Sequence, residues 1–228
     1  MLQWCKGYFT RAEKALWLCS AVMICVSFFL FDKVNYLSLI ASLIGVTSLL
    51  FNAKGNPAGQ ALTVVFSLIY GAISWKFAYY GEMITYMGMT APMAVLALAT
   101  WLRNPYQGDR AQVKVNRLRR GEGALAALLT AAVTVVFYFI LRGFHTANLL
   151  PSTLSVATSF LAVYLTFRRS AAFAVAYAAN DLVLIVLWAM AARTDPSAVS
   201  VLVCFAMFFL NDIYGFLNWR LMRARQAA

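Results

Sequence analysis

Residues 124–141 read ALAALLTAAVTVVFYFIL, a run of eighteen positions without a charge, a glycine or a proline. The hydrocarbon core of a bilayer is about 30 Å thick and is crossed by roughly 20 consecutive apolar residues in a helix. The apolar residues are continuous and do not alternate with polar ones, which indicates a helix and not a barrel strand. The run therefore predicts a transmembrane helix.

Seven further apolar segments lie on either side of this run, and short polar connectors join them. In all, 63% of the chain is hydrophobic and 12% is charged, whereas a soluble domain is about 45–50% apolar and about 25% charged. The sequence therefore predicts an all-α membrane protein with about eight transmembrane helices and little room for a soluble domain. The eight segments are Ala15–Phe31, Tyr36–Phe51, Gly59–Tyr79, Met83–Leu102, Ala124–Leu141, Leu149–Phe167, Ala171–Met190 and Ser197–Trp219.

The basic residues are distributed unevenly along this pattern. The net charge is +11, and with eight spans fifteen of the 19 lysines and arginines fall on the side that holds both termini. Such a bias predicts that both termini are cytoplasmic. It also accounts for the basic composition without nucleic-acid binding. The first apolar segment follows Lys14 like a signal peptide, but Asp32 and Lys33 follow it in place of a small-residue cleavage site, so we expect a retained span.

The longest connector, residues 103–122, is strongly basic and divides the chain into two halves of four spans. Each half ends alike, with Trp101-Leu102-Arg103 and with Trp219-Arg220-Leu221, at an offset of 118 positions. Four spans return the chain to its starting side, so such repeats would be parallel. This offset is the basis for predicting an internal repeat.

Polar side chains within the apolar segments are few. Inside a membrane such residues usually face a bundle interior or a water-filled cavity. They also serve as glue between helices, and for these residues we weigh both roles equally. The residues that we predict to line a binding site are Gln60, Tyr70, Thr90, Asn180, Asp181, Trp188, Asn211, Asp212 and Tyr214.

Helical spacing groups some of these residues. Tyr177, Asp181, Leu184 and Trp188 share one face of the seventh span, and Asn211, Tyr214 and Asn218 share one face of the eighth. An aromatic plate beside amides and carboxylates suits a small ring that carries hydroxyl or amide groups. Tryptophan and aspartate together also suit a cation. No lysine or arginine lies at mid-span, so a phosphate would find no partner there.

Other residues have simpler readings. Pro92 removes a backbone hydrogen bond in the fourth span, which makes it a hinge or only a packing feature. Glu82, at a helix start, is expected to cap the helix or to face water. Trp75, Trp101 and Trp219 end their spans and are expected to be interfacial anchors.

No feature of the sequence indicates an enzymatic reaction or a metal site. The four cysteines have no metal-ligand spacing, His145 is alone, and neither a nucleotide-binding loop nor a nucleophile–base pattern occurs. The chain is therefore expected to be no enzyme and to use no cofactor or metal.

Three stretches carry a family resemblance: YYGEMITYMGMTAP at 79–92, NAKGN at 52–56 and NDIYGFLNW at 211–219. Together they resemble the PnuC family of vitamin B3 transporters, in its nicotinamide riboside branch, which is related to the SWEET transporters. The resemblance implies two parallel three-helix bundles, a linker helix and an added N-terminal helix. In this chain they would be an N-terminal helix (1–34), a first bundle (35–102), a basic loop with the linker helix (103–148) and a second bundle (149–228).

The resemblance also implies a function. It is facilitated diffusion (uniport) of nicotinamide riboside across the bacterial inner membrane, where a cytoplasmic kinase then traps the substrate for NAD biosynthesis. By analogy the protein would be a homotrimer. The nicotinamide ring would lie against Trp188, with Asn180 and Asn211 at the carboxamide and hydroxyls and with Gln60 and Tyr70 on the opposite bundle. Gly59 stands where eukaryotic relatives have a proline, which leaves Pro92 as the nearest hinge candidate.

Three alternatives stay open at this stage. The same lining suits another B vitamin or nucleoside, such as thiamine, riboflavin or a deoxynucleoside. The chain could instead be a membrane scaffold that transports nothing, with the polar pairs as glue. Proton coupling through Asp181 or Asp212 is the third alternative.

Overall fold

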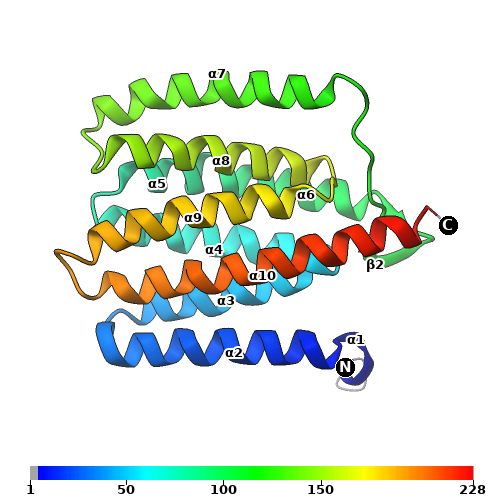
Figure 1. Ribbon diagram of the computed structural model, residues 1–228, viewed down its shortest axis with the longest axis horizontal. Coiled ribbons are helices and arrows are strands. Elements are labelled where there is room, and N and C mark those ends of the chain that lie inside the picture. Colours follow the sequence, from blue (N-terminus) through cyan, green and yellow to red (C-terminus); the bar gives the residue numbers. More distant parts are fainter. Residues whose placement is uncertain (1–4, 228) are drawn as a thin grey trace.

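Eight long helices make up the molecule, which we describe from a computed structural model covering residues 5–227 (Figure 1). Their number and approximate bounds confirm the prediction from the apolar segments. After a short first helix α1 (Cys5–Tyr8), the spans are α2 (Arg11–Ser27) continued by the π-helical η1 (Phe28–Asp32), α3 (Tyr36–Ala53), α4 (Pro57–Lys76), α5–η2–α6 (Tyr80–Thr85, Tyr86–Thr90, Ala91–Leu102), α7 (Glu122–Gly143), α8 (Leu149–Phe167), α9 (Phe173–Ala191) and α10 (Ala198–Arg225).

Local sequence explains where two of these helices begin. Thr10 and Glu13 form a capping box at the start of α2, in which each side chain bonds to the backbone N–H of the other residue. Asn56 caps α4 through Ala58 N–H, and Pro57 follows at the first helical turn, where no N–H is needed.

The helices form two groups with a helix outside each. In one group α4 packs between α3 and the broken span α5–η2–α6, and in the other α9 packs between α8 and α10. The groups meet where α10 contacts α3 and where α6 and α5 contact α8. Of the outer helices, α2 packs on α3 and α10, and α7 packs on α8 (Figure 1). Only 11% of the apolar window of α7 is buried, so most of that helix faces lipid.

The fourth span is interrupted by the π-helical segment η2, directly before Pro92. Proline has no backbone N–H and its ring clashes with the carbonyl four residues earlier, so the preceding turn widens. The sequence predicts an irregularity at Pro92, but the extra residue in the turn before it has no signal of its own.

The connector between α6 and α7 is ordered and is not a simple loop. It forms a hairpin of β1 (Pro105–Tyr106) and β2 (Asp109–Val113), whose turn residues Gln107 and Gly108 have φ angles of 50° and 84°. We call residues 104–118 the strap. Val113 N–H donates to Gly55 O (2.9 Å) and Asn116 N–H donates to Arg169 O (3.0 Å). The strap thus bonds to the α3–α4 turn and to the α8–α9 turn.

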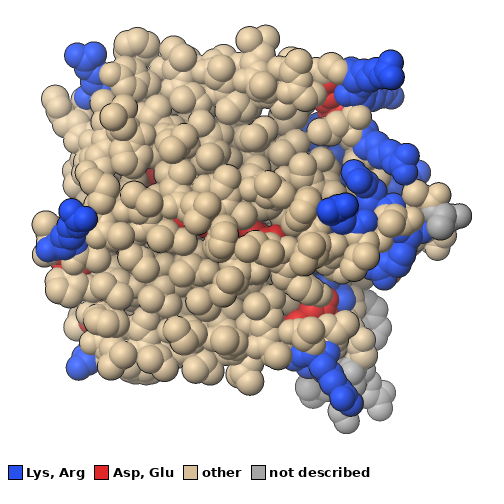
Figure 2. All heavy atoms as spheres, in the orientation of Figure 1, with Lys and Arg blue, Asp and Glu red and all other residues tan. Residues whose placement is uncertain are grey.

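Charge is concentrated at one end of the bundle. Figure 2 shows lysines and arginines gathered around the end that holds the strap and both termini, while few lie at the other end. We call these the basic end and the opposite end. The shared end of the termini agrees with an even number of spans.

Two of the tryptophans predicted to be interfacial anchors are core residues instead. The Trp101 and Trp219 side chains are fully buried, and Trp75 alone is exposed as expected. The prediction was wrong because each indole turns inward to a carbonyl of the other helix group: Trp101 Nε1 donates to Thr166 O (3.0 Å) and Trp219 Nε1 donates to Asn52 O (2.8 Å).

Candidate functional site

A small cavity of about 40 Å³ lies between the two helix groups. A space of this size holds water but no larger solute. Its lining combines two acids, an amide, hydroxyls and aromatic rings. The lining residues are Ser48, Leu49, Asn52, Thr63, Phe66, Tyr86, Thr90, Phe173, Tyr177, Asp181, Phe208 and Asp212.

The two acids come from neighbouring helices, α9 and α10. Asp181 and Asp212 are both buried, and they are close enough to interact directly. With a rise of 1.5 Å per residue, they lie about 15 Å and about 21 Å from the opposite-end termini of their helices, near mid-membrane. One oxygen of Asp181 has no hydrogen-bond partner among the described residues. Buried carboxyls without a full set of partners are costly, and at mid-membrane they are a hallmark of solute pathways.

A polar wall faces these acids from the other helix group. Asn52 Nδ2 donates to Thr63 Oγ1 (3.2 Å), and Ser48 lies one turn before Asn52 on α3. These three lining residues are absent from our predicted set. Ser48 and Asn52 are spaced i, i+4 at the end of the second span, and that spacing could have found them.

Aromatic side chains close the bundle on the opposite-end side of the cavity. Trp188 Nε1 donates to Tyr70 Oη (2.7 Å), and Phe77 and Tyr79 lie edge-on to the Trp188 ring at 5.0 and 5.4 Å. Tyr79 Oη in turn donates to Leu187 O (3.1 Å), and burial raises the pKa of Tyr79, which keeps this donor protonated. We call Tyr70, Phe77, Tyr79 and Trp188 the aromatic plug.

A second aromatic cluster lies toward the basic end. The Phe173 ring, which lines the cavity, packs edge-on against Trp219 at 4.8 Å, and Trp219 lies 5.4 Å from Trp101. The cavity therefore lies between aromatic clusters on both sides along the bundle axis.

Glu82 is a further buried acid, in the first turn of α5 near the plug. Its side chain is fully buried, so the expectation that it faces water was wrong, and it does not cap the helix. Neither carboxylate oxygen has a hydrogen-bond partner among residues 5–227. Sequence reasoning missed this position because α8 covers α5, a packing that local spacing does not reveal.

The predicted binding residues separate into three sets. Asp181, Asp212 and Thr90 line the cavity, while Trp188 and Tyr70 belong to the plug. The remaining four are bonded elsewhere.

Each of these four bonds to a neighbouring helix. The Asn180 Oδ1 atom accepts from Thr158 Oγ1 (2.8 Å) and Ser159 Oγ (2.9 Å) on α8. Asn211 Nδ2 donates to Ser20 Oγ (2.9 Å), and Tyr214 Oη donates to Glu13 Oε1 (2.8 Å). Gln60 Nε2 donates to Asn52 Oδ1 (2.8 Å), so Gln60 contacts a residue of the cavity wall without lining the cavity itself.

The side chains of the described residues form no cluster of three or more metal ligands. The cavity offers acids, an amide and hydroxyls. A polar, acid-lined cavity between two groups of apolar helices is instead suited to hold a solute within the membrane.

These features define a multi-pass α-helical membrane transporter, and comparisons with known proteins agree. The family model for the nicotinamide mononucleotide transporter matches residues 35–221. The chain belongs to this family, which consists of transporters and not enzymes.

Two curated relatives share one name, nicotinamide riboside transporter PnuC. The chain is 25% identical over 219 residues to the nicotinamide riboside transporter PnuC of Neisseria mucosa, covering 93% of this chain and 82% of that protein. It is 20% identical over 190 residues to the nicotinamide riboside transporter PnuC of Haemophilus influenzae, covering 81% and 79%. A crystal structure of the vitamin B3 transporter PnuC has the same fold, with a TM-score of 0.85 at 22% identity over 96% of this chain and 95% of that one.

Proposed function

We propose that this protein carries nicotinamide riboside across the bacterial inner membrane by facilitated diffusion. The observation that carries the proposal is the pair Asp181 and Asp212, buried in an aromatic cavity between the two helix groups. Family membership and the names of the two relatives support the choice of substrate.

The chemistry of the substrate matches that lining. Nicotinamide riboside is a pyridinium cation with a carboxamide and ribose hydroxyls. Carboxylates at mid-membrane attract the cation, and tyrosine and tryptophan rings offer faces for the pyridinium ring. The amide of Asn52 and the hydroxyls of Thr63 and Thr90 offer partners for the carboxamide and the ribose.

Transport requires this cavity to widen. Sites for small molecules measure about 300–1,000 Å³, several times the present volume of about 40 Å³. We propose that residues 35–102 and 149–228 act as two bundles that rock against each other, with residues 103–148 as connector and residues 1–34 outside. Pro92 and the π-helical turn before it would be the hinge, because a turn that lacks a regular hydrogen bond bends at lower cost.

Widening would bring further residues to the substrate. Separation of the bundles would break the Trp188–Tyr70 hydrogen bond and free the indole to stack on the nicotinamide ring. Asn180, Asn211, Tyr214 and Gln60 stay in the proposed site as residues that exchange their present partners for the ligand.

The direction of transport would be set outside the protein. A carrier without an energy source only equilibrates its substrate, so a cytoplasmic kinase that phosphorylates the riboside would trap it. We place the basic end, with both termini, in the cytoplasm, because fifteen of the 19 basic residues lie on that side. We also propose a homotrimer, which native mass spectrometry in nanodiscs would test.

Proteoliposomes that contain only this protein test the function directly. Labelled nicotinamide riboside should enter down its gradient, and an imposed pH gradient should not change the initial rate. Unlabelled riboside should compete better than thiamine, riboflavin or a deoxynucleoside. Absence of uptake by folded protein would overturn the proposal and favour a scaffold. Stronger competition by another compound would reassign the substrate, and acceleration by a pH gradient would replace uniport with proton coupling.

A further inference from the structure

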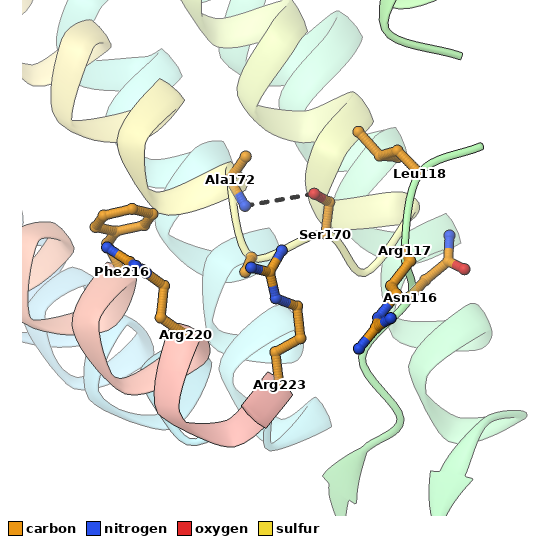
Figure 3. A pocket seen from close by; sticks show the side chains of 9 residues that line it. Asn116, Arg117, Leu118, Ser170, Ala172, Phe216, Arg220 and Arg223 are labelled. Atoms are coloured by element: carbon orange, nitrogen blue, oxygen red, sulfur yellow. Dashed lines mark hydrogen bonds between the residues drawn. The ribbon is translucent and has the colours of Figure 1, made fainter. Parts of the chain in front are cut away.

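A large surface cavity lies at the basic end, apart from the site discussed above. It measures about 720 Å³ and lies between the strap, the α8–α9 turn and the last part of α10. Three guanidinium groups surround it, from Arg117, Arg220 and Arg223 (Figure 3). The figure shows Arg220 and Arg223 rising from α10 on one side and Arg117 on the strap on the other.

These three arginines have no acidic partner. The ion pairs of the described residues are Lys54 with Glu13 and Arg168 with Glu122, and no aspartate or glutamate lines this cavity among residues 5–227. Three like charges around one space repel one another, which is unfavourable unless a counter-charge enters. The positive-inside bias explains why basic residues lie at this end, but it does not explain why three of them converge on one cavity.

The remaining lining supplies neutral hydrogen-bond donors. Asn116 offers an amide, and Ser170 offers a hydroxyl from the turn that leads into α9. The N-cap residue Ala172 cannot cap α9 with its side chain, so the positive end of the helix dipole points toward the cavity with the Ser170 hydroxyl as its side-chain acceptor. Ala172 N–H has only a long contact of 3.4 Å with Ser170 Oγ.

Two of the arginines lie side by side on α10, and one of them packs on an aromatic ring. The Arg220 guanidinium lies over the Phe216 ring at 5.7 Å, and Arg220 and Arg223 are one turn apart on the same face of α10.

From this geometry we infer that the basic-end cavity binds a phosphate group. Guanidinium forks match phosphate oxygens bidentately, and a helix N-terminus adds backbone donors. Basic pockets between transmembrane helices are known to take anionic headgroups, and a soluble phosphate ester presents the same chemistry. The volume admits a phosphate together with the group that bears it.

The basic-end cavity adjoins the aromatic contact that separates the central cavity from the basic end. Ala172 precedes Phe173, and Arg220 follows Trp219, the two aromatic residues that pack at 4.8 Å beside the central cavity. A phosphate bridging the α8–α9 turn and α10 would therefore stabilise that contact. The inference does not depend on which solute the central cavity carries.

Two binding experiments on the full-length protein in nanodiscs test it. The first uses equal parts phosphatidylcholine and phosphatidylglycerol and counts retained phosphatidylglycerol by native mass spectrometry. The second uses phosphatidylcholine alone and titrates adenosine 5′-monophosphate by calorimetry, with adenosine as the phosphate-free control. The test variant is Arg220→Gln with Arg223→Gln. The matched control is Arg103→Gln with Arg110→Gln, which removes the same charge at the same end outside the cavity.

We expect the test variant to weaken phosphate binding about tenfold or more, the loss of a charge-assisted contact, and the control to stay within about twofold. An effect in the first experiment alone assigns the site to a lipid headgroup, and in the second alone to a soluble phosphate ester. Equal losses in both variants, or no binding of either phosphate source by the wild type, would overturn the inference. All four arginines are exposed, and an unchanged melting temperature verifies folding.

Discussion

Tyr70 and Trp188 are 118 positions apart in the chain, and the Trp188 indole donates a hydrogen bond of 2.7 Å to the Tyr70 hydroxyl. Trp101 and Trp219 have the same separation, and their ring centroids lie 5.4 Å apart. Equivalent residues of two repeats can touch each other only beside the axis that relates the repeats. One pair lies in the plug and the other toward the basic end, so this axis runs along the bundle.

The hydrogen bonds of the buried tryptophans follow the same symmetry. Trp101 bonds to the carbonyl of Thr166, the second-last residue of α8, and Trp219 bonds to that of Asn52, the second-last residue of α3. Each helix group therefore closes onto the equivalent point of the other. This reciprocity supports the parallel repeat that the 118-residue offset predicts.

The Tyr70→Phe substitution should destabilise the closed bundle. It leaves Trp188 Nε1 buried without an acceptor, which costs about 1–3 kcal/mol. Thermal unfolding followed by tryptophan fluorescence measures the loss. Tyr164→Phe serves as the control, because Tyr164 is half-buried and only its ring packs, on Phe160; it should stay within about 0.5 kcal/mol. Equal stability of the two variants would show that the plug does not depend on this bond.

The carboxyls of Asp181 and Asp212 should recognise the charge of the substrate. In Asp181→Asn and Asp212→Asn we expect binding of nicotinamide riboside to weaken about tenfold or more, through the loss of a charge–charge contact. Binding of uncharged nicotinamide should change little. Fluorescence quenching measures both ligands. Asp195→Asn, in the exposed α9–α10 loop, is the control. Parallel losses for both ligands would mean that the acids only shape the cavity.

Glu82 should matter for passage and not for stability. The Glu82→Gln variant is expected to unfold at the same or a higher temperature, because glutamine removes the cost of burying a charge without partners. Its uptake in proteoliposomes should fall about fivefold, the effect of about 1 kcal/mol. Glu13→Gln gives the contrast, since Glu13 accepts bonds from Thr10, Lys54 and Tyr214 and its loss should destabilise the fold. A marked drop in the melting temperature of Glu82→Gln would assign that residue a structural role.

Trp101→Phe should cost about 2–3 kcal/mol, because it removes the indole hydrogen bond to the Thr166 carbonyl, which keeps its bond from the Arg169 N–H, and opens a small cavity beside Trp219. Trp75→Phe, at a side chain that is 60% exposed, should cost less than about 0.5 kcal/mol. Denaturation by heat in the same detergent compares the two. Similar losses would contradict the buried position of Trp101.

The sequence predicts the spans of this fold well and the irregular parts poorly. Hydropathy determines where Glu122–Gly143 and the other spans lie, because each must cross the same oily layer. Pro92 signals an irregularity in the fourth span but not the π-helical turn at Tyr86–Thr90 itself. The hairpin of the strap depends on contacts with distant segments, such as Val113 with Gly55. No local pattern encodes those contacts.

The candidate site shows the same division. Burial of a charge at mid-membrane is unusual enough to identify Asp181 and Asp212 from sequence. The sequence does not show which amide faces the cavity. Asn52 lines it, while Asn211 bonds to Ser20 on α2. Both amides sit in apolar helices, and only the packing of α2 against α10 distinguishes them.

The strap limits how far the two halves can move at the basic end. The Val113 amide donates to the Gly55 carbonyl in the α3–α4 turn, and the Asn116 amide donates to the Arg169 carbonyl in the α8–α9 turn. The strap therefore binds one turn of each helix group. The three residues from Val113 to Asn116 reach at most about 11 Å when fully extended. The distance between the two turns is therefore limited to that length plus two hydrogen bonds. A wider separation of the two helix groups at the basic end requires one of these two hydrogen bonds to break. The opposite end is linked by side-chain bonds instead, from Tyr79 Oη to Leu187 O and from Asn148 Nδ2 to Tyr79 Oη, so opening there would break these bonds and not a backbone tether.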